Sequence, residues 1–465
     1  MTRRLKPALY AVGLSLLFTG VAHAAHPLVD AARNADHDSI RRLLESKIDV
    51  NAAEADGTTA LHWASYRDDV ESAELLIRAG ANVNAANDLG ATPVWTASLN
   101  GSVAMVRRLL EAGANPDAAL LLGETAVMVA ARSGHAGVVQ QLLARGAHVN
   151  ARAARGQTAL MWAVAQKHPD VVRVLLAHGA DVRARSDSWS QVMAVSPHGH
   201  PEYNRAIPFG GNTPLMFAAR VGDLESAKLL VASGADVNDA DAWGISVVVL
   251  AAHSGFRDLV EFLLESGADA NSSAAGFTAL HEAVMRRDEG LVRTLLAHGA
   301  DPHARLQAWT PTRRQSTDLH FEPELVGATP FWLAARFVQP RVMRLLVEFG
   351  ADPLFVHRSD RVVDGREGRA YDHRYDATTA LMAALGMGGG GAAWVPPDRS
   401  QREVLTLETV RLAMEMGIDV NAVNTDGRTA LDAAKALKYE TVVAYLVEKG
   451  AKPGVKDDQD EQAPK

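Results

Sequence analysis

The stretch "GTTALHWAS" at residues 57–65 returns three times at a constant interval, and this recurrence decides the fold. It is followed by "GATPVWTAS" at 90–98, "GETAVMVAA" at 123–131 and "GQTALMWAV" at 156–164, each 33 residues after the last. Six further copies start at residues 211, 244, 276, 327, 377 and 427. A period of this length indicates a stack of supersecondary units, since one unit cannot bury its apolar face alone.

Each copy has the signals of a helix start, and a second signal follows about 20 residues later. Thr59 and Thr92 can accept backbone N–H groups at a helix N-terminus, and Pro93 suits the first turn. The second signal, such as "LLIRAGANVN" at 75–84, contains a glycine, Gly80, just past the predicted helix end, where a left-handed residue is favoured. Each period therefore predicts two helices and a connecting loop.

The two signals together resemble the ankyrin repeat, whose pattern is G-x-T-P-L-H-x-A-A followed by L-L-x-x-G-A-D-V-N. The resemblance covers nearly all of residues 25–452. It implies an all-α solenoid of helix-turn-helix units with finger loops, made of one N-terminal cap at 27–51 and about ten repeats. Such a fold implies interaction with a partner without naming one.

Four insertions interrupt the period, near residues 184–208, 304–325, 355–375 and 386–403. The first three follow the end of a second helix, so we expect them to lengthen fingers. The fourth follows "TALMAAL" and is expected to separate a first helix from a second helix near 404–416, on the edge opposite the fingers.

The fourth insertion contains "GMGGGG" at 386–391, which satisfies the G-x-G-x-x-G spacing of a dinucleotide-binding turn. That turn needs a strand before it and a helix opening directly after it. Here a predicted helix precedes the glycines, and Pro396 and Pro397 follow them. The sequence therefore favours a helix stop and a loop, and no cofactor is predicted.

Both chain ends are expected to lie outside the repeats. Basic residues, a short apolar run at 8–21 and Ala22-His-Ala24 predict a signal peptide over residues 1–24. An uncleaved membrane anchor is the alternative. Cysteine is absent, which excludes disulfides, and the signal suits a bacterial periplasm or secretion. Residues 453–465 predict a disordered acidic tail.

Histidine is the one plausible source of metal or acid–base chemistry. His62 and His281 occupy the T-x-x-H slot, where the resemblance implies a hydrogen bond within the scaffold. His198, His200 and His320 are weak candidates for a metal site formed by two fingers. The sequence contains no catalytic motif that we recognise, so we expect no enzyme activity.

Five arginines fall at or near the ends of the first helices, in a chain whose net charge is −8. Such a strip could bind carboxylates of a partner, although each arginine could equally cap helix carbonyls and stay solvated. Aromatic residues in the fingers could add apolar contacts or could pack the fingers down. The predicted partner-binding residues are Arg67, Arg132, Arg220, Arg286, Arg336, Tyr66, Phe337, Trp189 and Trp309.

The sequence thus predicts a monomeric, non-enzymatic scaffold that binds an unknown protein, with an acidic segment of that protein as the candidate ligand. Its acidic charge disfavours nucleic acid, and no membrane contact is expected after signal cleavage. Two other functions stay open. One is a solenoid that binds a metal or small ligand through finger histidines and carboxylates. The other is a secreted effector or immunity-type protein.

Overall fold

A computed structural model describes residues 26–193, 205–310, 321–364, 371–389 and 398–454. These residues form 22 α-helices in eleven consecutive pairs, which confirms the all-α solenoid with one cap and ten repeats. The chain divides into a first unit that ends at Ala180 and a second unit that begins at Asp181.

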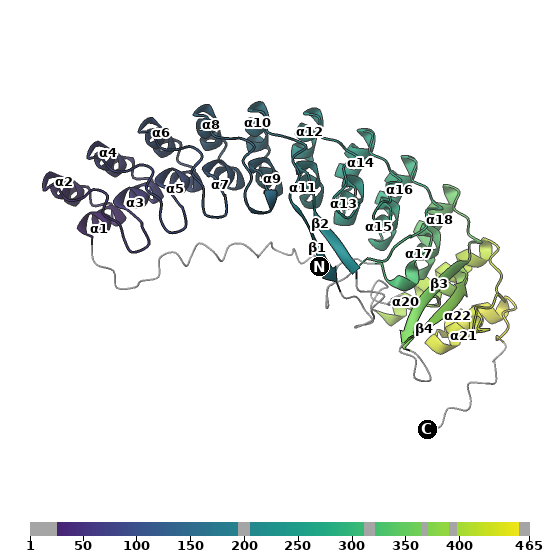
Figure 1. Cartoon of the computed structure of the whole chain (residues 1–465). Helices are drawn as coiled ribbons and strands as arrows, with labels where there is room; N and C mark the ends of the chain where they lie inside the picture. Colours follow the sequence, from purple (N-terminus) through teal and green to yellow (C-terminus); the bar gives the residue numbers. More distant parts are fainter. Residues whose placement is uncertain (1–25, 194–204, 311–320, 365–370, 390–397, 455–465) are drawn as a thin grey trace, which may run out of the picture. The chain divides into compact units, whose positions relative to one another are not determined.

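In the first unit, the first helix of each pair packs on the first helix of the next, and the second helices do the same (Figure 1). The first helices are α1 (Pro27–Arg33), α3 (Ala60–Tyr66), α5 (Pro93–Asn100), α7 (Ala126–Arg132) and α9 (Ala159–Ala165). The second helices are α2 (His37–Glu45), α4 (Val70–Arg78), α6 (Val103–Glu111), α8 (Ala136–Ala144) and α10 (Pro169–Ala177). A single 3-10 turn, η1 (Ala154–Gly156), lies in the last described finger of this unit.

The second unit repeats the arrangement with six helix pairs. Its first helices are α11 (Pro214–Val221), α13 (Val247–Ser254), α15 (Ala279–Met285), α17 (Pro330–Arg336), α19 (Ala380–Ala384) and α21 (Ala430–Leu437). Its second helices are α12 (Leu224–Ala232), α14 (Arg257–Glu265), α16 (Glu289–Ala297), α18 (Pro340–Glu348), α20 (Arg399–Glu415) and α22 (Glu440–Glu448). The 3-10 turn η3 (Pro323–Leu325) lies in the second insertion.

The repeat residues act as the sequence predicts. The Thr92 side chain accepts from the Trp95 amide at the start of α5, and Leu61 and Leu160 are buried in the core. Gly113 follows α6 with a φ of 90°, a value that favours glycine. The Asn84 side chain donates to the Gly113 carbonyl over 3.1 Å, so each finger is tied to its neighbour. These contacts fix the fingers at a regular spacing.

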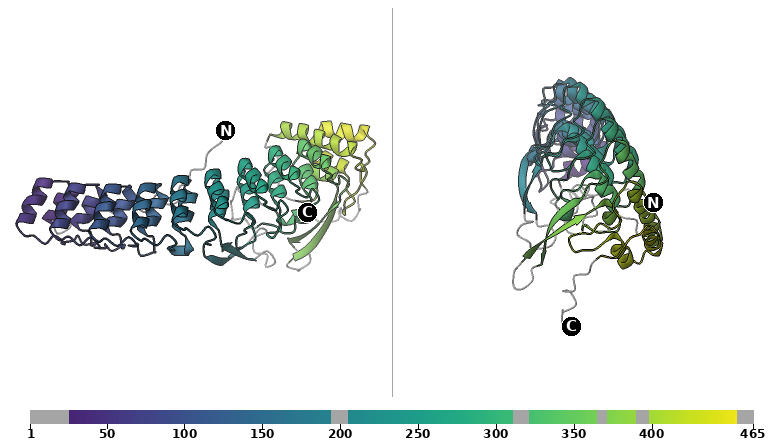
Figure 2. Two further views of the ribbon diagram at one scale, coloured as in Figure 1. Left: turned by 90° about the horizontal axis from the view of Figure 1, so that it is seen from above. Right: turned by 90° about the vertical axis from the view of Figure 1, so that its right-hand side faces the viewer.

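Two insertions form β-hairpins where the sequence predicts only longer fingers. Strand β1 (Ser188–Met193) pairs antiparallel with β2 (Arg205–Gly210), and β3 (His357–Asp364) pairs antiparallel with β4 (Tyr371–Thr378). Both hairpins extend from the finger side of the second unit (Figure 2). Trp189 stacks on Phe209 across the first hairpin, with ring centroids 5.9 Å apart.

The glycine run of the fourth insertion does not form a dinucleotide-binding turn. Helix α19, not a strand, leads into it, and α20 begins only at Arg399. Gly388 lies so close to Trp332 and Thr378 that an added Cβ would be 2.8 Å and 2.7 Å from their side chains. The described part of the loop thus packs on α17 and on the end of the preceding hairpin, and residues 390–397 lie outside the described ranges, so the expectation that the insertion lies opposite the fingers stays a prediction.

Candidate partner-binding surface

In the first unit, the end of α3 carries two exposed residues of the predicted set. Tyr66 is 46% exposed and meets Trp63 edge to face, with ring centroids 5.9 Å apart. Arg67 is the C-cap residue of α3 and is also exposed. Within the described part of the chain, the Arg67 side chain makes no hydrogen bond or ion pair. Its charge is therefore available to a ligand.

Arg132, at the end of α7, is held within the scaffold. Its guanidinium lies 2.9 Å from the Glu124 carboxylate and 5.3 Å from the centre of the Trp162 ring. Burial raises the pKa of Glu124, and the positive charge of Arg132 acts in the opposite direction. Arg132 therefore compensates a half-buried carboxylate, which leaves less of its charge for a partner.

In the second unit, Arg220 and Arg286 are exposed and have neutral hydrogen-bond acceptors. Arg220 donates to the side-chain carbonyl of Asn212 over 3.1 Å; partial burial of the guanidinium lowers the pKa of Arg220, and the charge of Asp241 acts against that shift. Arg286 donates to the main-chain carbonyl of His253 over 2.7 Å, at the end of the preceding first helix. Arg286 therefore caps the end of the preceding first helix, as expected if the arginines only cap helix carbonyls and stay solvated. Among the described residues, however, no carboxylate pairs with its guanidinium.

The expectation of exposure is wrong for Arg336 and Phe337. They are 6% and 1% exposed, respectively. The Arg336 Nε donates to the Gly389 carbonyl over 2.9 Å. Arg287, from an earlier repeat, donates to the Phe337 carbonyl over 2.6 Å. Both residues belong to the interior of the second unit and cannot serve as an exposed contact surface.

The two finger tryptophans have different environments. Trp189 is exposed on β1, stacked on Phe209, and Trp309 is half-buried in the second insertion. Nearby Phe321 is buried, with its ring centroid 5.3 Å from that of Phe277. Packing of the finger therefore accounts for Phe321, while Trp189 is 43% exposed. Partner binding by either tryptophan stays a prediction.

The fingertips of the first unit form an apolar surface that the sequence analysis missed. Leu121 and Leu122 are 76% and 74% exposed, and Leu89 on the preceding tip is 43% exposed. The Leu121 amide donates to the Leu89 carbonyl over 3.0 Å, so the two tips are in direct contact. Only Leu120 of the "LLL" run packs inward, beside Trp95. The run itself was the available signal, because no other finger has three leucines directly before its glycine.

The two T-x-x-H histidines are scaffold residues. His62 and His281 complete capping boxes with Thr59 and Thr278 at the starts of α3 and α15. Burial lowers the pKa of His281 to about 4 and also lowers the pKa of His62. The Thr278 amide donates to the Nδ1 of His281 over 3.2 Å, which requires that nitrogen to be unprotonated.

Lowering the pH is expected to destabilise the wild-type protein more than it destabilises the His281→Gln variant. A folded pKa of about 4 against the ordinary value of 6.5 means that the unfolded chain binds the proton first. The contribution of neutral His281 to the free energy of unfolding is complete above pH 6.5 and is lost as the pH falls toward 4. At pH 5 the loss is about 2 kcal/mol. Glutamine keeps the capping-box acceptor and does not titrate. Urea unfolding at pH 7.5 and pH 5 measures the difference; equal acid losses in both proteins would contradict this role.

The predicted metal site cannot be located. His198, His200 and His320 lie outside the described residues. Among the residues that are described, no cluster of three or more histidine, aspartate or glutamate side chains is arranged to hold a metal ion. The structure thus adds no support to a metal-binding function.

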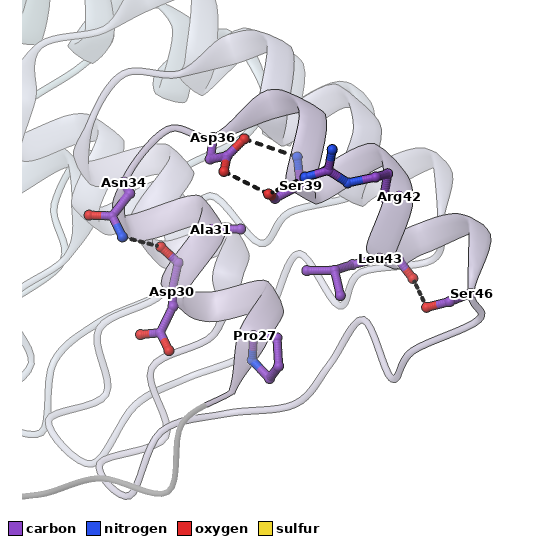
Figure 3. Close-up of a pocket in the computed structure, with 9 residues that line it drawn as sticks. All are labelled: Pro27, Asp30, Ala31, Asn34, Asp36, Ser39, Arg42, Leu43 and Ser46. Carbon is purple, nitrogen blue, oxygen red and sulfur yellow. Dashed lines mark hydrogen bonds between the residues drawn. The ribbon is translucent and has the colours of Figure 1, made fainter.

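A cavity of about 570 Å³ lies at the start of the first unit, between α1 and α2 (Figure 3). Its polar groups bond mainly to one another: Ser39 donates to Asp36, and Arg42 donates to the Ser39 hydroxyl. Asn34 likewise donates to the Asp30 carbonyl over 2.9 Å. The N-terminal end of the first unit is therefore polar and its groups are hydrogen-bonded, which is consistent with the solvated cap that the sequence predicts.

Comparison with known proteins agrees with this architecture. A family model for ankyrin repeats in three copies matches residues 28–119, 116–186 and 215–305, and one for many copies matches residues 160–231. The chain therefore belongs to the ankyrin repeat family. It is similar to the ankyrin repeat domain of human ASB11, with 27% identity and a TM-score of 0.44, over 53% of this chain and 99% of that one.

Two curated relatives are similar to this chain over only part of their own length. An ankyrin repeat-containing protein of Treponema pallidum (strain Nichols) is 38% identical over 104 residues, which are 22% of this chain and 35% of that protein. The E3 ubiquitin-protein ligase KEG of Arabidopsis thaliana is 30% identical over 303 residues, which are 58% of this chain and 17% of the ligase. The chain thus spans about a third or less of the length of these relatives.

None of the helices within the described ranges combines the length and the apolar character that crossing a membrane requires.

Proposed function

We propose that this chain is an exported, non-enzymatic scaffold of the periplasm that binds an acidic segment of a partner protein at the ends of its first helices. Ankyrin repeats generally mediate protein–protein interaction, and the two units present ten such repeats and a cap. The ends of the first helices recur in every repeat, so a partner can contact several of them at once within either unit.

The exposure of Arg67 and Arg286 carries this proposal. Each guanidinium is exposed at the C-cap of its first helix, and in the described parts of the chain no carboxylate pairs with either. A planar guanidinium can donate two parallel hydrogen bonds to one carboxylate. Tyr66, adjacent to Arg67, adds an exposed aromatic ring of the kind that dominates many interfaces.

Reversing these two charges is expected to abolish capture of the partner. The double variant Arg67→Glu with Arg286→Glu replaces attraction to a carboxylate by repulsion, and binding by the wild type should weaken with salt. The measurement compares the proteins that tagged wild type and variant recover from the periplasmic fraction at low and moderate salt.

The matched control reverses Arg78 and Arg293, one exposed arginine on a second helix of each unit. Circular dichroism should show the same helix content in all three proteins. A protein recovered equally by wild type and both double variants would exclude the helix ends as its binding site.

Export is a separate part of the proposal and has its own measurement. Cleavage after Ala24 is expected, because Ala22-His-Ala24 follows a charged start and a short apolar run. The intact mass of protein from the periplasmic fraction should correspond to a chain that starts at Ala25. Recovery of only the full-length chain from the cytosol would contradict export.

A further inference from the structure

The repeat formed by α21 and α22 exposes a face that other repeats bury against the helix pair that follows them. In other first helices, the sixth residue after the capping threonine is buried, as Ala131 and Ala335 are. Its equivalent in α21 is Lys435, which is exposed. In the second helices, the third residue before the glycine is buried at Leu110, whereas its equivalent in α22, Val447, is 54% exposed. We call this side of α21 and α22 the end face.

The end face is basic. Lys435 lies in the last turn of α21, and Lys438 is the exposed C-cap residue of that helix. In the described part of the chain, neither amino group forms an ion pair with a carboxylate. The Asp432 carboxylate accepts from the Thr429 and Gly454 amides over 2.9 Å and 2.8 Å, which hold it toward the start of α21. Both lysines are therefore open to an acidic ligand.

The chain leaves the last repeat beside the end face. The Lys452 amide donates to the Asn421 side-chain carbonyl over 2.7 Å, which is the tie that joins fingers in other repeats. Residues 450–454 therefore follow the path of a finger. Gly454 packs so closely on the start of α21 that an added Cβ would collide with the Gly427 carbonyl. The residues that follow Gly454 thus begin next to α21.

We propose that the acidic run at residues 457–461, DDQDE, binds the lysines of the end face in the same chain. The run has four carboxylates in five residues, so its charge is opposite to that of the face. Helix α21 is about 12 Å long, at 1.5 Å per residue. The seven residues from 455 to 461 can span about 23 Å, so the carboxylates can reach both Lys435 and Lys438.

Tethering favours the chain's own acidic run over that of a second copy. A segment joined to the edge of the face has an effective concentration on the order of millimolar. The contact would close the exposed end of the second unit in place of a further repeat and would shield part of Val447. This inference departs from the disordered tail that the sequence predicts. It is independent of the proposed partner site, because it involves neither Arg67 nor Arg286.

Zero-length cross-linking of the full chain tests where the acidic run lies. A carbodiimide joins a carboxylate to a lysine amine only when the two are in contact, and mass spectrometry identifies the joined peptides. We expect links from residues 457–461 to Lys435 and Lys438, and their loss at roughly 1 M salt. Lys228, an exposed lysine at the start of the second unit, is the control and should not be linked to the run. An equimolar mixture of ¹⁵N-labelled and unlabelled protein should give links within one copy only.

Hydrogen exchange measures what the contact does to the last repeat. A variant with Asn at 457, 458 and 460 and Gln at 461 has a neutral run of nearly the same size. Amides of α21 and α22 should exchange about threefold to tenfold faster in this variant, the range for two exposed ion pairs. Amides of α11 should be unchanged. Lys435→Glu should give a similar loss of protection in the wild-type chain and a smaller one in the neutral-run variant, because the two changes remove the same contact.

Three results would overturn the inference. One is the absence of links from the acidic run to Lys435 and Lys438 at low salt. Another is equal exchange of α21 and α22 in the wild type and the neutral-run variant. The third is a set of links that joins only labelled to unlabelled copies, which would assign the end face to a second molecule.

Discussion

Replacing Arg336 with glutamate is expected to lower the free energy of unfolding by about 3–5 kcal/mol, the range for breaking a buried charged contact. Arg336 is buried, and its Nε donates to the Gly389 carbonyl. Burial lowers the pKa of its guanidinium, and the nearby negative charge of Glu322 acts against that shift. Glutamate would remove the hydrogen bond and add a second negative charge beside Glu322.

Urea unfolding followed by circular dichroism measures this effect. Arg286→Glu is the matched control, because Arg286 is an exposed arginine near the end of another first helix and should cost less than about 1 kcal/mol. Equal and small losses in both variants would mean that Arg336 is solvated. If the expected loss occurs, Arg336 is unsuitable for testing partner binding, because its variants would unfold the surface they are meant to probe.

Replacing Gly388 with valine is expected to cost about 2–5 kcal/mol, from left-handed backbone strain and overpacking together. Gly388 has a φ of 89°, and an added Cβ would meet the Trp332 ring and the Thr378 hydroxyl. Trp332 is fully buried, so its ring cannot move aside. The glycine is therefore required by close approach of the loop to the preceding repeat.

Gly386→Val separates the two causes. Gly386 has a similar φ of 84°, but no atom lies within 4 Å of an added Cβ. This control should show the backbone strain alone, so the Gly388 variant should be less stable than the Gly386 variant by roughly 1–3 kcal/mol in the same urea experiment. Equal losses would show that the loop does not pack on Trp332.

The repeats could be predicted from sequence because each one contains the same residues at the ends and in the core of its helices. Threonine before the first helix, leucine within it and glycine after the second helix each have a local physical reason and recur at a fixed interval. A sequence whose many local signals agree in this way specifies a single fold. The hairpins could not be predicted in this way, because β1 and β3 occur once each and have no repeated neighbour to reveal their register.

The candidate surface was predictable only in part. The position of Arg67 at a helix end follows from the repeat, and so does its exposure. The burial of Arg336 does not, since it depends on how the glycine loop folds back across a long insertion. The exposed tip leucines were visible in the sequence as "LLLG" at 120–123, but a run of leucines in a helical protein is usually read as core.

Chemical modification of arginine in the intact protein, with and without its captured partner, tests most directly whether the helix ends are the binding surface. A dicarbonyl reagent modifies exposed guanidinium groups, and mass spectrometry gives the rate at each arginine. If the helix ends bind the partner, Arg67 and Arg286 should be protected in the complex, while Arg78 and Arg293 on the second helices react as before. Protection of Arg78 and Arg293 with unchanged rates at Arg67 and Arg286 would contradict the proposal.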